Sequence, residues 1–342
     1  MKAQRILLAR TDRLGDVVLS TPVIKHMRKL FPDAYIAFMV RPQNRDVVAN
    51  NPYLDEIIVY DKYGREKSFW KTFKFALSLK EKKFDLAIAL HPTNRVHIML
   101  FLAGVPVRIG YDRKMGYLLT KRVAHLKQKG DKHEVDYNFD LLKEAGFDAE
   151  GADRMPLIAT NENEKRLVDS VLRDRSLRDG MIALHAGASC PSKRWPAERF
   201  AEVADMLADK YGFQIVLVGG DETSVFSKEV AGAMKNKAVD LTGIFLVGEL
   251  AEFLSRVRLF ISNDSGPVHV AVAVGTPVVV IFGRQERGLS PKRWRPLGEN
   301  DIVLHKGSEC EICRAHNCDK DFKCLKAVTT DEVREAAEKL LG

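Results

Sequence analysis

Two turn-forming segments in the second half of the chain most constrain its fold. His185–Pro196 follows the apolar run Met181–Leu184, and Ser262–His269 follows the apolar run Leu259–Ile261. Each segment contains glycine and polar residues and leads into a helical pattern. Turns between a buried strand and a helix are where parallel α/β sheets bind phosphates and nucleotides. Two of them in one half of the chain indicate a nucleotide-sugar site.

Apolar runs that predict buried strands alternate with periodic helical stretches along the chain, the pattern of parallel sheets covered on both faces. In the first half we expect strands at Ile6–Ala9, Tyr35–Val40, Ile57–Tyr60, Leu86–Leu90 and Val107–Ile109, with helices around Val17–Leu30, Ser68–Lys83, Val96–Ala103 and Val135–Ala145. In the second half we expect strands at Met181–Leu184, Gln214–Val218, Val239–Leu241, Leu259–Ile261 and Val278–Phe282, with helices near Ala197–Lys210, Gly248–Val257 and Val268–Val274. The two halves are therefore expected to share one α/β architecture.

The length of 342 residues suits two domains. The polar stretch Asp148–Asn163 has little periodicity and contains Pro156, so it is the best candidate for a linker. We expect an N-terminal domain of residues 1–160 and a C-terminal domain of residues 161–328. A last helix, Asp331–Leu341, lies in the remaining segment 329–342 and is expected to pack back on the first domain.

The positive charge of the chain is confined to its first half. Residues 1–160 contain 28 Lys and Arg against 19 Asp and Glu, whereas the remainder contains 26 against 27. Because the electrostatic field of these charges acts at the surface on which they lie, an anionic partner is expected at the first domain.

Neither a secretory signal nor a membrane-spanning run of about eighteen apolar residues is recognisable, so the protein is expected in the cytoplasm. Four of the five cysteines lie in Cys310–Cys324, which is not the spread framework of a disulfide-stapled domain. The spacing of Cys310, Cys313, Cys318 and Cys324 suits a structural zinc site, and four reduced cysteines are the alternative.

The first expected strand is followed by Arg10-Thr-Asp-Arg-Leu-Gly-Asp16. Asp16 lies at the start of the next helix, where a carboxylate stabilises the helix dipole by about 0.3–1 kcal/mol. The functional alternative is a general base that takes a proton from a substrate hydroxyl. Gly15 favours this alternative because it allows close approach of a substrate to the backbone. Asp12 is the competing candidate.

In the His185–Pro196 segment, Lys193 follows a glycine-containing loop and is placed to meet a diphosphate as a point charge. Pro196 is a favourable first residue for the following helix. The alternative is that the charged side chains of this loop are solvated and bind no ligand. We interpret Trp195 as a packing residue and His185 as a hydrogen-bonded histidine at a strand end.

Two further turns follow expected strands. Gly219-Gly-Asp-Glu222 places acids where ribose hydroxyls are bound in such folds, although helix capping also explains them. Asn263-Asp-Ser-Gly-Pro267 places an acid, a hydroxyl and a glycine before a helix that begins at Pro267, so backbone amides there would face a phosphate.

With these pieces in this order and spacing, nearly the whole chain resembles a bacterial ADP-heptose:lipopolysaccharide heptosyltransferase of glycosyltransferase family 9. The matching pieces are Arg10–Pro22, the His185–Pro196 loop, Val218–Glu222 and Asn263–His269. The resemblance implies a GT-B fold, with two Rossmann-like, doubly wound parallel-sheet domains facing a cleft. It further implies an acceptor-binding N-domain, a donor-binding C-domain, and cofactor-free, metal-independent transfer with inversion at the sugar carbon.

The resemblance also implies roles for particular residues. Asp16 matches the catalytic base, and Lys193 matches the lysine at the donor phosphates. The other positions matched to donor binding are His185, Gly187, Ala188, Glu222, Asp264, Ser265, Gly266 and His269. Some members carry threonines where this chain has Gly187 and Ala188, so we expect Ser189 or backbone amides to replace those hydroxyl contacts.

An inner-core acceptor made of lipid A and Kdo is anionic, which fits the basic first half. The candidates for contacting it are Arg13, Arg41, Arg45, Arg95 and Arg108. Ser68–Lys83 places Phe69, Phe73 and Leu77 on one helical stripe near several lysines. We expect this helix to cover the sheet of its own domain; the alternative is contact with the cytoplasmic surface of the inner membrane.

Transfer of a heptose from ADP-L-glycero-D-manno-heptose to the lipopolysaccharide core is therefore the predicted activity, by a monomeric protein peripheral to the inner membrane. A nucleotide-sugar epimerase of the same fold and a non-catalytic nucleotide-sugar-binding protein are the alternatives. No Gly-x-Gly-x-x-Gly follows the first strand, which argues against an NAD-dependent dehydrogenase. No nucleic-acid partner is expected.

Overall fold

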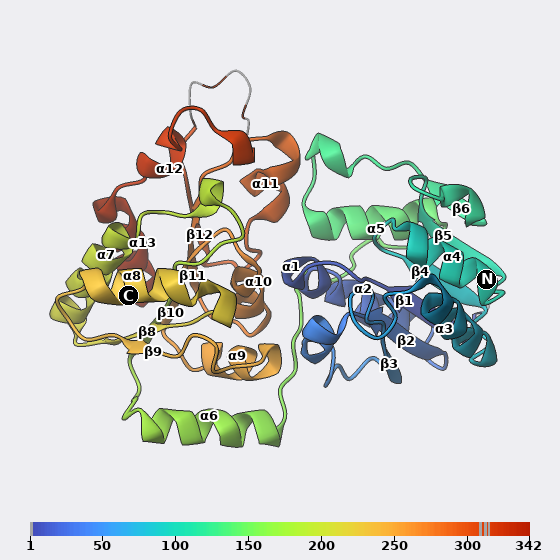
Figure 1. Ribbon diagram of the computed structural model, residues 1–342, viewed down its shortest axis with the longest axis horizontal. Coiled ribbons are helices and arrows are strands. Elements are labelled where there is room, and N and C mark those ends of the chain that lie inside the picture. The colour runs from blue at the N-terminus through green and yellow to red at the C-terminus, as the bar shows by residue number, and fades with distance from the viewer. Residues whose placement is uncertain (1–2, 308–309, 311–312, 314) are drawn as a thin grey trace. The chain divides into compact units, whose positions relative to one another are not determined.

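The computed structural model describes residues 3–307, 310, 313 and 315–342 (Figure 1). The chain forms two compact units. The first unit comprises residues 1–128 and 134–159, and the second comprises residues 129–133 and 160–342. The main division falls between residues 159 and 160, where the sequence analysis places it between 160 and 161.

The first unit is built on six parallel strands in the order β3-β2-β1-β4-β5-β6. The strands are β1 (Arg5–Ala9), β2 (Tyr35–Val40), β3 (Glu56–Val59), β4 (Leu86–Ala89), β5 (Val107–Tyr111) and β6 (Lys121–Val123). The α-helices are α1 (Leu14–Val18), α2 (Thr21–Leu30), α3 (Phe69–Glu81), α4 (Asn94–Leu102) and α5 (Glu134–Glu144). Alternate residues of the central strands, such as Leu7 and Ala9 of β1, pack with α3 and α4 on one face of the sheet.

The second unit repeats this plan with the strand order β12-β11-β10-β7-β8-β9, also all parallel. Its strands are β7 (Met181–His185), β8 (Gln214–Leu217), β9 (Val239–Asp240), β10 (Leu259–Asn263), β11 (Val278–Phe282) and β12 (Ile302–His305). Its helices are α6 (Glu162–Asp174), α7 (Ala197–Tyr211), α8 (Ser224–Ala233), α9 (Val247–Leu254), α10 (Gly266–Ala273), α11 (Pro291–Trp294), α12 (Lys323–Lys326) and α13 (Thr330–Leu341). The predicted pair of doubly wound parallel sheets is confirmed.

In each sheet the chain first adds strands on one side of its first strand and then adds the remaining strands on the other side. This reversal lies between β1 and β4 in the first unit and between β7 and β10 in the second. Ligands of open α/β sheets bind beyond the carboxyl ends of the strands at such a switch point. The turns after β1 and β4, and those after β7 and β10, are therefore the places where function is expected.

The single helix expected over Val17–Leu30 is instead two helices, α1 and α2. Pro22 has no N–H to bond the Val18 carbonyl, which accepts from the Thr21 hydroxyl at 2.8 Å instead. The Ser20 hydroxyl similarly bonds the Asp16 carbonyl at 2.8 Å. The short helix α1 is thereby separated from α2, and it carries Asp16.

Several elements were not anticipated: α6, α8, α11, α12, β6 and β12. Helix α6 begins at the end of the expected linker, because Asn161 and Glu164 form a capping box. The Asn161 side chain accepts from the Glu164 amide at 3.1 Å, and the Glu164 carboxylate accepts from the Asn161 amide at 2.7 Å. This pattern was readable in the sequence.

The expected stripe of Phe69, Phe73 and Leu77 does not cover the sheet. Helix α3 covers its sheet, as expected, but it does so with Thr72, Ala76 and Leu79. No helix among the described residues is both long and apolar enough to cross a bilayer.

The last helix, α13, packs within the second unit, contrary to the expectation that it returns to the first domain. Val333 and Ala337 are fully buried in the core that β7, β8, β10 and β11 share with α7. Lys210 of α7 and Glu338 of α13 form an ion pair at 3.0 Å. The apolar face of this helix therefore completes one layer of the second unit.

Replacing Val333 by Ala should lower the free energy of unfolding by about 2 kcal/mol, because it removes two buried methyl groups and leaves a cavity. Urea denaturation followed by circular dichroism measures this change. Glu335→Ala, on the exposed side of the same helix, is the matched control and should change stability by less than about 0.5 kcal/mol. Equal effects of the two substitutions would contradict the packing described.

Candidate functional site

The turn after β1 is organised by the guanidinium group of Arg10, which is 1% exposed. Its Nε donates to Asp12 at 2.8 Å, and one terminal nitrogen donates to the Leu90 carbonyl at 3.2 Å. The other terminal nitrogen donates to Asp16 and, at 3.1 Å, to Glu134 of α5. Arg10 therefore joins three carboxylates at the carboxyl edge of the first sheet, here called the first edge.

A second cation completes this cluster. Lys127 lies 2.6 Å from Glu134 and donates to Asn138 at 3.1 Å. Two cations thus meet three carboxylates, which leaves an excess of negative charge. Burial, followed by the negative charge of Asp12, raises the pKa of Asp16 to about 6. At neutral pH Asp16 is mostly ionised and is a stronger base than an ordinary aspartate.

His91 belongs to the first edge and was not singled out from the sequence. It follows β4 at the switch point, and its Nδ1 lies 3.2 Å from Asp12. Partial burial, followed by the positive charge of Arg10, lowers the pKa of His91, so the ring is neutral at pH 7. The available signal was its position directly after a strand beside β1.

Two of the predicted acceptor-binding arginines lie at the first edge. Arg13 is exposed just before α1. Arg41 donates to the Asp12 carbonyl at 3.4 Å and lies over the Tyr63 ring at 4.9 Å. Lys62, which was not predicted, reaches the same loop through the Thr11 carbonyl at 2.8 Å.

The other three arginines have different surroundings. Arg45 is exposed and pairs with its neighbour Asp46 at 3.5 Å. Arg95 donates to the carbonyls of Lys62 at 3.0 Å and Lys67 at 2.8 Å, so its donors hold a loop. Arg108 lies near the amino end of β5 and donates to the carbonyls of Val105 and Leu118. The structure therefore does not bring Arg108 to the first edge.

In the second unit, the turns after β7, β8, β10 and β11 converge at the carboxyl edge of the sheet, here called the second edge. Asp264, after β10, is 6% exposed. One of its carboxylate oxygens lies 3.0 Å from Lys193 and 2.8 Å from Arg284. Lys193 also donates to the Asp264 carbonyl at 3.0 Å. One buried carboxylate thus holds two cations, and the cluster carries an excess of positive charge.

Arg284 follows the expected strand Val278–Phe282 and was not predicted to belong to the site. The side chain is 5% exposed, and its Nε is buried without a hydrogen-bond partner among the described residues. The signal that could have identified it was a charged residue two positions after a fully buried strand.

His185 fills the space between two glycine turns. Its Nδ1 lies 3.1 Å from the Ser265 hydroxyl, and burial lowers its pKa to about 4, so the ring is neutral. A side chain at Gly187 would collide with Thr223, and one at Gly219 would collide with both Thr223 and His185. The interpretation of His185 as a hydrogen-bonded strand-end histidine is confirmed.

The loop that carries Lys193 is fixed at both ends. Asn263 accepts from the Trp195 amide at 3.0 Å and donates to the Ala186 carbonyl at 2.7 Å. The Trp195 ring is buried, and its indole N–H donates to the Val328 carbonyl at 3.0 Å. Trp195 is therefore a packing residue, as predicted.

The remaining predicted donor-binding residues also lie in the second unit. Ala188 and His269 are buried, Ser189 and Glu222 are exposed, and Gly266 is the first residue of α10. The helix begins one residue before the expected Pro267. The Ser265 hydroxyl does not cap it and bonds Ser262 and His185 instead.

The four clustered cysteines lie beside the second edge. The Cys324 thiol donates to the Gly283 carbonyl at 2.6 Å. Burial, with smaller effects from Cys313, Cys318 and Cys310, raises its pKa. Among the described residues, no group of three or more His, Cys, Asp or Glu side chains could hold a metal ion. Structural zinc at this cluster stays a prediction.

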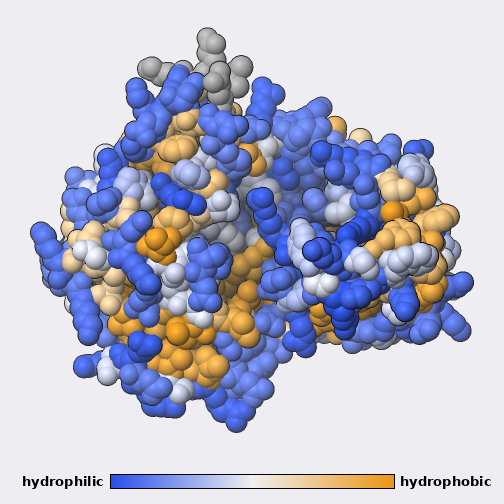
Figure 2. Space-filling view, viewed as in Figure 1, coloured by the Kyte–Doolittle hydropathy of each residue, from blue (hydrophilic) through white to orange (hydrophobic). Residues whose placement is uncertain are grey.

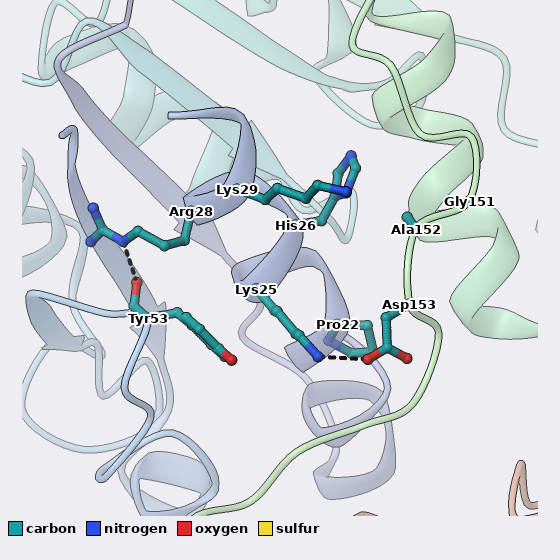
Figure 3. A pocket seen from close by; sticks show the side chains of 9 residues that line it. All are labelled: Pro22, Lys25, His26, Arg28, Lys29, Tyr53, Gly151, Ala152 and Asp153. Carbon is teal, nitrogen blue, oxygen red and sulfur yellow. Dashed lines mark hydrogen bonds and ion pairs between the residues drawn. The ribbon is translucent and has the colours of Figure 1, made fainter. Parts of the chain in front are cut away.

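A pocket of about 350 Å³ in the first unit lies elsewhere (Figure 3). It is formed between α2 and the segment around Asp153, and Lys25 pairs with Asp153 at 2.7 Å. None of the predicted site residues lines it.

Replacing Arg284 by Met should lower the free energy of unfolding by about 1.5–3 kcal/mol, because the buried carboxylate of Asp264 loses a charge-assisted hydrogen bond of 2.8 Å. Urea denaturation measures the loss. Arg287→Met, at an exposed position of the same loop, should change stability by less than about 0.5 kcal/mol. A stability loss no greater than that of the control would mean that the Arg284–Asp264 pair is unimportant.

Comparison with known proteins identifies the family. The family model "Glycosyltransferase family 9 (heptosyltransferase)" matches residues 72–323. The chain is 26% identical to lipopolysaccharide heptosyltransferase 3 of Escherichia coli K12, over 96% of this chain and 95% of that protein. It is also 26% identical to heptosyltransferase 2 of the same strain, over 88% and 87% of the two chains.

Solved structures agree with this assignment. A family 9 glycosyltransferase from Veillonella parvula has a TM-score of 0.91 and 30% identity, covering 99% of this chain and 97% of that one. Heptosyltransferase II of E. coli has a TM-score of 0.81 and 24% identity, covering 99% and 98%. The fold is therefore that of the GT-B heptosyltransferases. The chain belongs to glycosyltransferase family 9, the heptosyltransferase family, and is a glycosyltransferase.

Proposed function

We propose that this protein transfers a heptose from ADP-L-glycero-D-manno-heptose to the inner core of lipopolysaccharide, with inversion and without a catalytic metal. Membership of family 9 supports the reaction class. The relatives that act on lipopolysaccharide support the class of acceptor. The transfer would take place at the cytoplasmic face of the inner membrane.

The observation that carries the proposal is the excess positive charge at the second edge. Lys193 and Arg284 share the single carboxylate of Asp264 at 3.0 and 2.8 Å. Helix α10 starts at Gly266, two residues after Asp264, and its first amides are not capped by the Ser265 side chain. Cations and a helix N-terminus together favour a diphosphate, and they stabilise the charge that develops on it when the sugar bond breaks.

The nucleoside half of the donor would lie beside the turn after β8. Asp221 and Glu222 are exposed there, so their carboxylates are available to accept hydrogen bonds from ribose hydroxyls. Adenosine diphosphate as the nucleotide is supported by E. coli heptosyltransferase WaaC, whose structure was solved with ADP.

The reaction needs a base for the acceptor hydroxyl, and Asp16 is our assignment. Its carboxylate takes the hydroxyl proton while the oxygen forms a bond to the anomeric carbon. The bond from that carbon to the β-phosphate oxygen breaks, and its electron pair leaves with ADP. Attack from the face opposite the leaving group inverts the configuration. Lys193 stabilises the departing diphosphate.

An anionic inner-core acceptor suits the surroundings of Asp16. Arg13, Arg41 and Lys62 lie on or contact the loops around the first edge. They would bind phosphate or carboxylate groups of lipid A and Kdo. His91, neutral and partly exposed beside Asp12, would offer its second ring nitrogen to a sugar hydroxyl.

Replacing Asp16 by Asn should lower kcat about 10²–10⁴-fold, because the carboxylate base is lost. ADP binding, measured by calorimetry, should stay within about twofold of the wild-type affinity, and ADP release measures turnover. Asp33→Asn, at an exposed position of the same unit, should leave turnover unchanged. Wild-type turnover by the Asp16 variant would rule out the assignment of the base.

The same assay with donor alone separates transfer from epimerisation. A transferase should release ADP only when an inner-core acceptor is added. Conversion of the donor sugar without acceptor would favour the epimerase instead, and donor binding without any ADP release would favour a non-catalytic binding protein.

The acid limb of the kcat/KM profile should fall below pH about 6, because Asp16 must be ionised to accept a proton. Asp12→Asn should move this limb to lower pH, since the negative charge of Asp12 raises the pKa of Asp16. Steady-state rates are measured from about pH 4.5 to about pH 8, a range that spans this pKa. A limb that stays in place or moves to higher pH would contradict the electrostatic account.

A further inference from the structure

Helix α3 has two apolar faces, of which one is buried. Thr72, Ala76 and Leu79 pack inside the first unit and are 6%, 0% and 1% exposed. On the other face, Phe69 is 65% exposed and Trp70 is 72% exposed. The helix therefore covers its sheet without using its most hydrophobic aromatic residues.

The exposed residues of this face form a continuous ridge together with the half-buried Phe73. Phe69, Phe73 and Leu77 are four residues apart and share one side of the helix, and Trp70 lies beside them. The Trp70 ring contacts Phe69 edge to face at 6.0 Å between centroids and Phe73 at 6.5 Å. Leu77 is 42% exposed. We call Phe69, Trp70, Phe73 and Leu77 the α3 ridge.

The charge around the α3 ridge is positive. From residue 67 to residue 80 the chain contains four lysines and no acidic residue. These lysines, all exposed, are Lys67, Lys71, Lys74 and Lys80. Figure 2 shows hydrophobic and hydrophilic residues side by side over the part of the first unit to which α3 belongs.

We propose that the α3 ridge docks on a bilayer containing anionic phospholipid, with α3 lying in the plane of the headgroups. Single exposed apolar residues are ordinary, but three aromatic rings in contact on a helix flanked by lysines are typical of an interfacial helix. The apolar residues enter the boundary between headgroups and acyl chains, and the lysines meet the lipid phosphates. The lysines favour anionic lipid over an uncharged surface.

This inference deepens the proposed function, because an acceptor built on lipid A lies in such a bilayer. Docking through α3 would keep the first unit at the surface where the acceptor is found, raising the local concentration of acceptor. Vesicle binding itself requires neither a donor nor an acceptor sugar, so it is tested separately from transfer.

The experiment is cosedimentation of the full-length protein with vesicles. Wild-type protein should bind vesicles made of phosphatidylcholine and phosphatidylglycerol in equal parts. It should bind vesicles of phosphatidylcholine alone at least tenfold more weakly. Added salt should weaken the binding, since the lysine contribution is screened.

Variants locate the docking surface. Phe69→Ala with Trp70→Ala should reduce binding to anionic vesicles at least tenfold. Lys71→Gln with Lys74→Gln should reduce it about fivefold per lysine. The matched control is Lys228→Gln with Lys235→Gln, at exposed positions of the second unit, which should bind as wild type. Circular dichroism and thermal unfolding verify that each variant is folded.

Undiminished binding by the folded α3 variants, or no binding of the wild type to anionic vesicles, would overturn the proposal. So would a concentration-dependent dimer in sedimentation velocity that Trp70→Ala abolishes, since the ridge would then be covered by a second copy. The Asp16→Asn variant should bind vesicles as wild type does, which separates failure of docking from failure of the transfer mechanism.

Discussion

The buried guanidinium of Arg10 is the interaction on which the first edge depends. It is hydrogen-bonded to Asp12, Asp16 and Glu134, so three carboxylates can be held together in a place that water barely reaches. The second edge has the opposite arrangement, with the carboxylate of Asp264 holding two cations. In the proposed transfer, the first edge supplies the proton acceptor and the second edge supplies the cations for the diphosphate. Glycosyl transfer from a nucleotide sugar needs one of each.

Most of the fold could be predicted because parallel strands are buried on both faces and therefore appear as short apolar runs. The strand Tyr35–Val40 was predicted with its observed bounds. Edge strands such as Lys121–Val123 were missed because two of their three residues are exposed, which removes the apolar signal. The last helix was predicted as a helix, but the domain on which it packs was predicted wrongly. Amphipathicity shows that one face of a helix is buried, but it does not show which element covers that face.

The candidate site was predictable where a residue lies in a turn after a strand, as Asp16 and Lys193 do. It was not predictable where the role depends on contacts across the fold. The position of Arg284 after a strand could be read from the sequence, but its ion pair with Asp264 could not. The raised pKa of Asp16 comes first from burial in the folded chain, which the sequence does not show. For Arg108 the sequence shows a strand but not that the side chain bonds carbonyls near the amino end of β5.

The central claim is that the carboxyl group of Asp16 is made unusually basic by its burial and by the negative charge of Asp12. A titration of the side-chain carboxyl carbons by NMR, with the resonance identified by its absence in the Asp16→Asn spectrum, measures this directly. The account predicts a pKa of about 6 for this resonance. A value at or below the ordinary 3.8 of an exposed aspartate would contradict it.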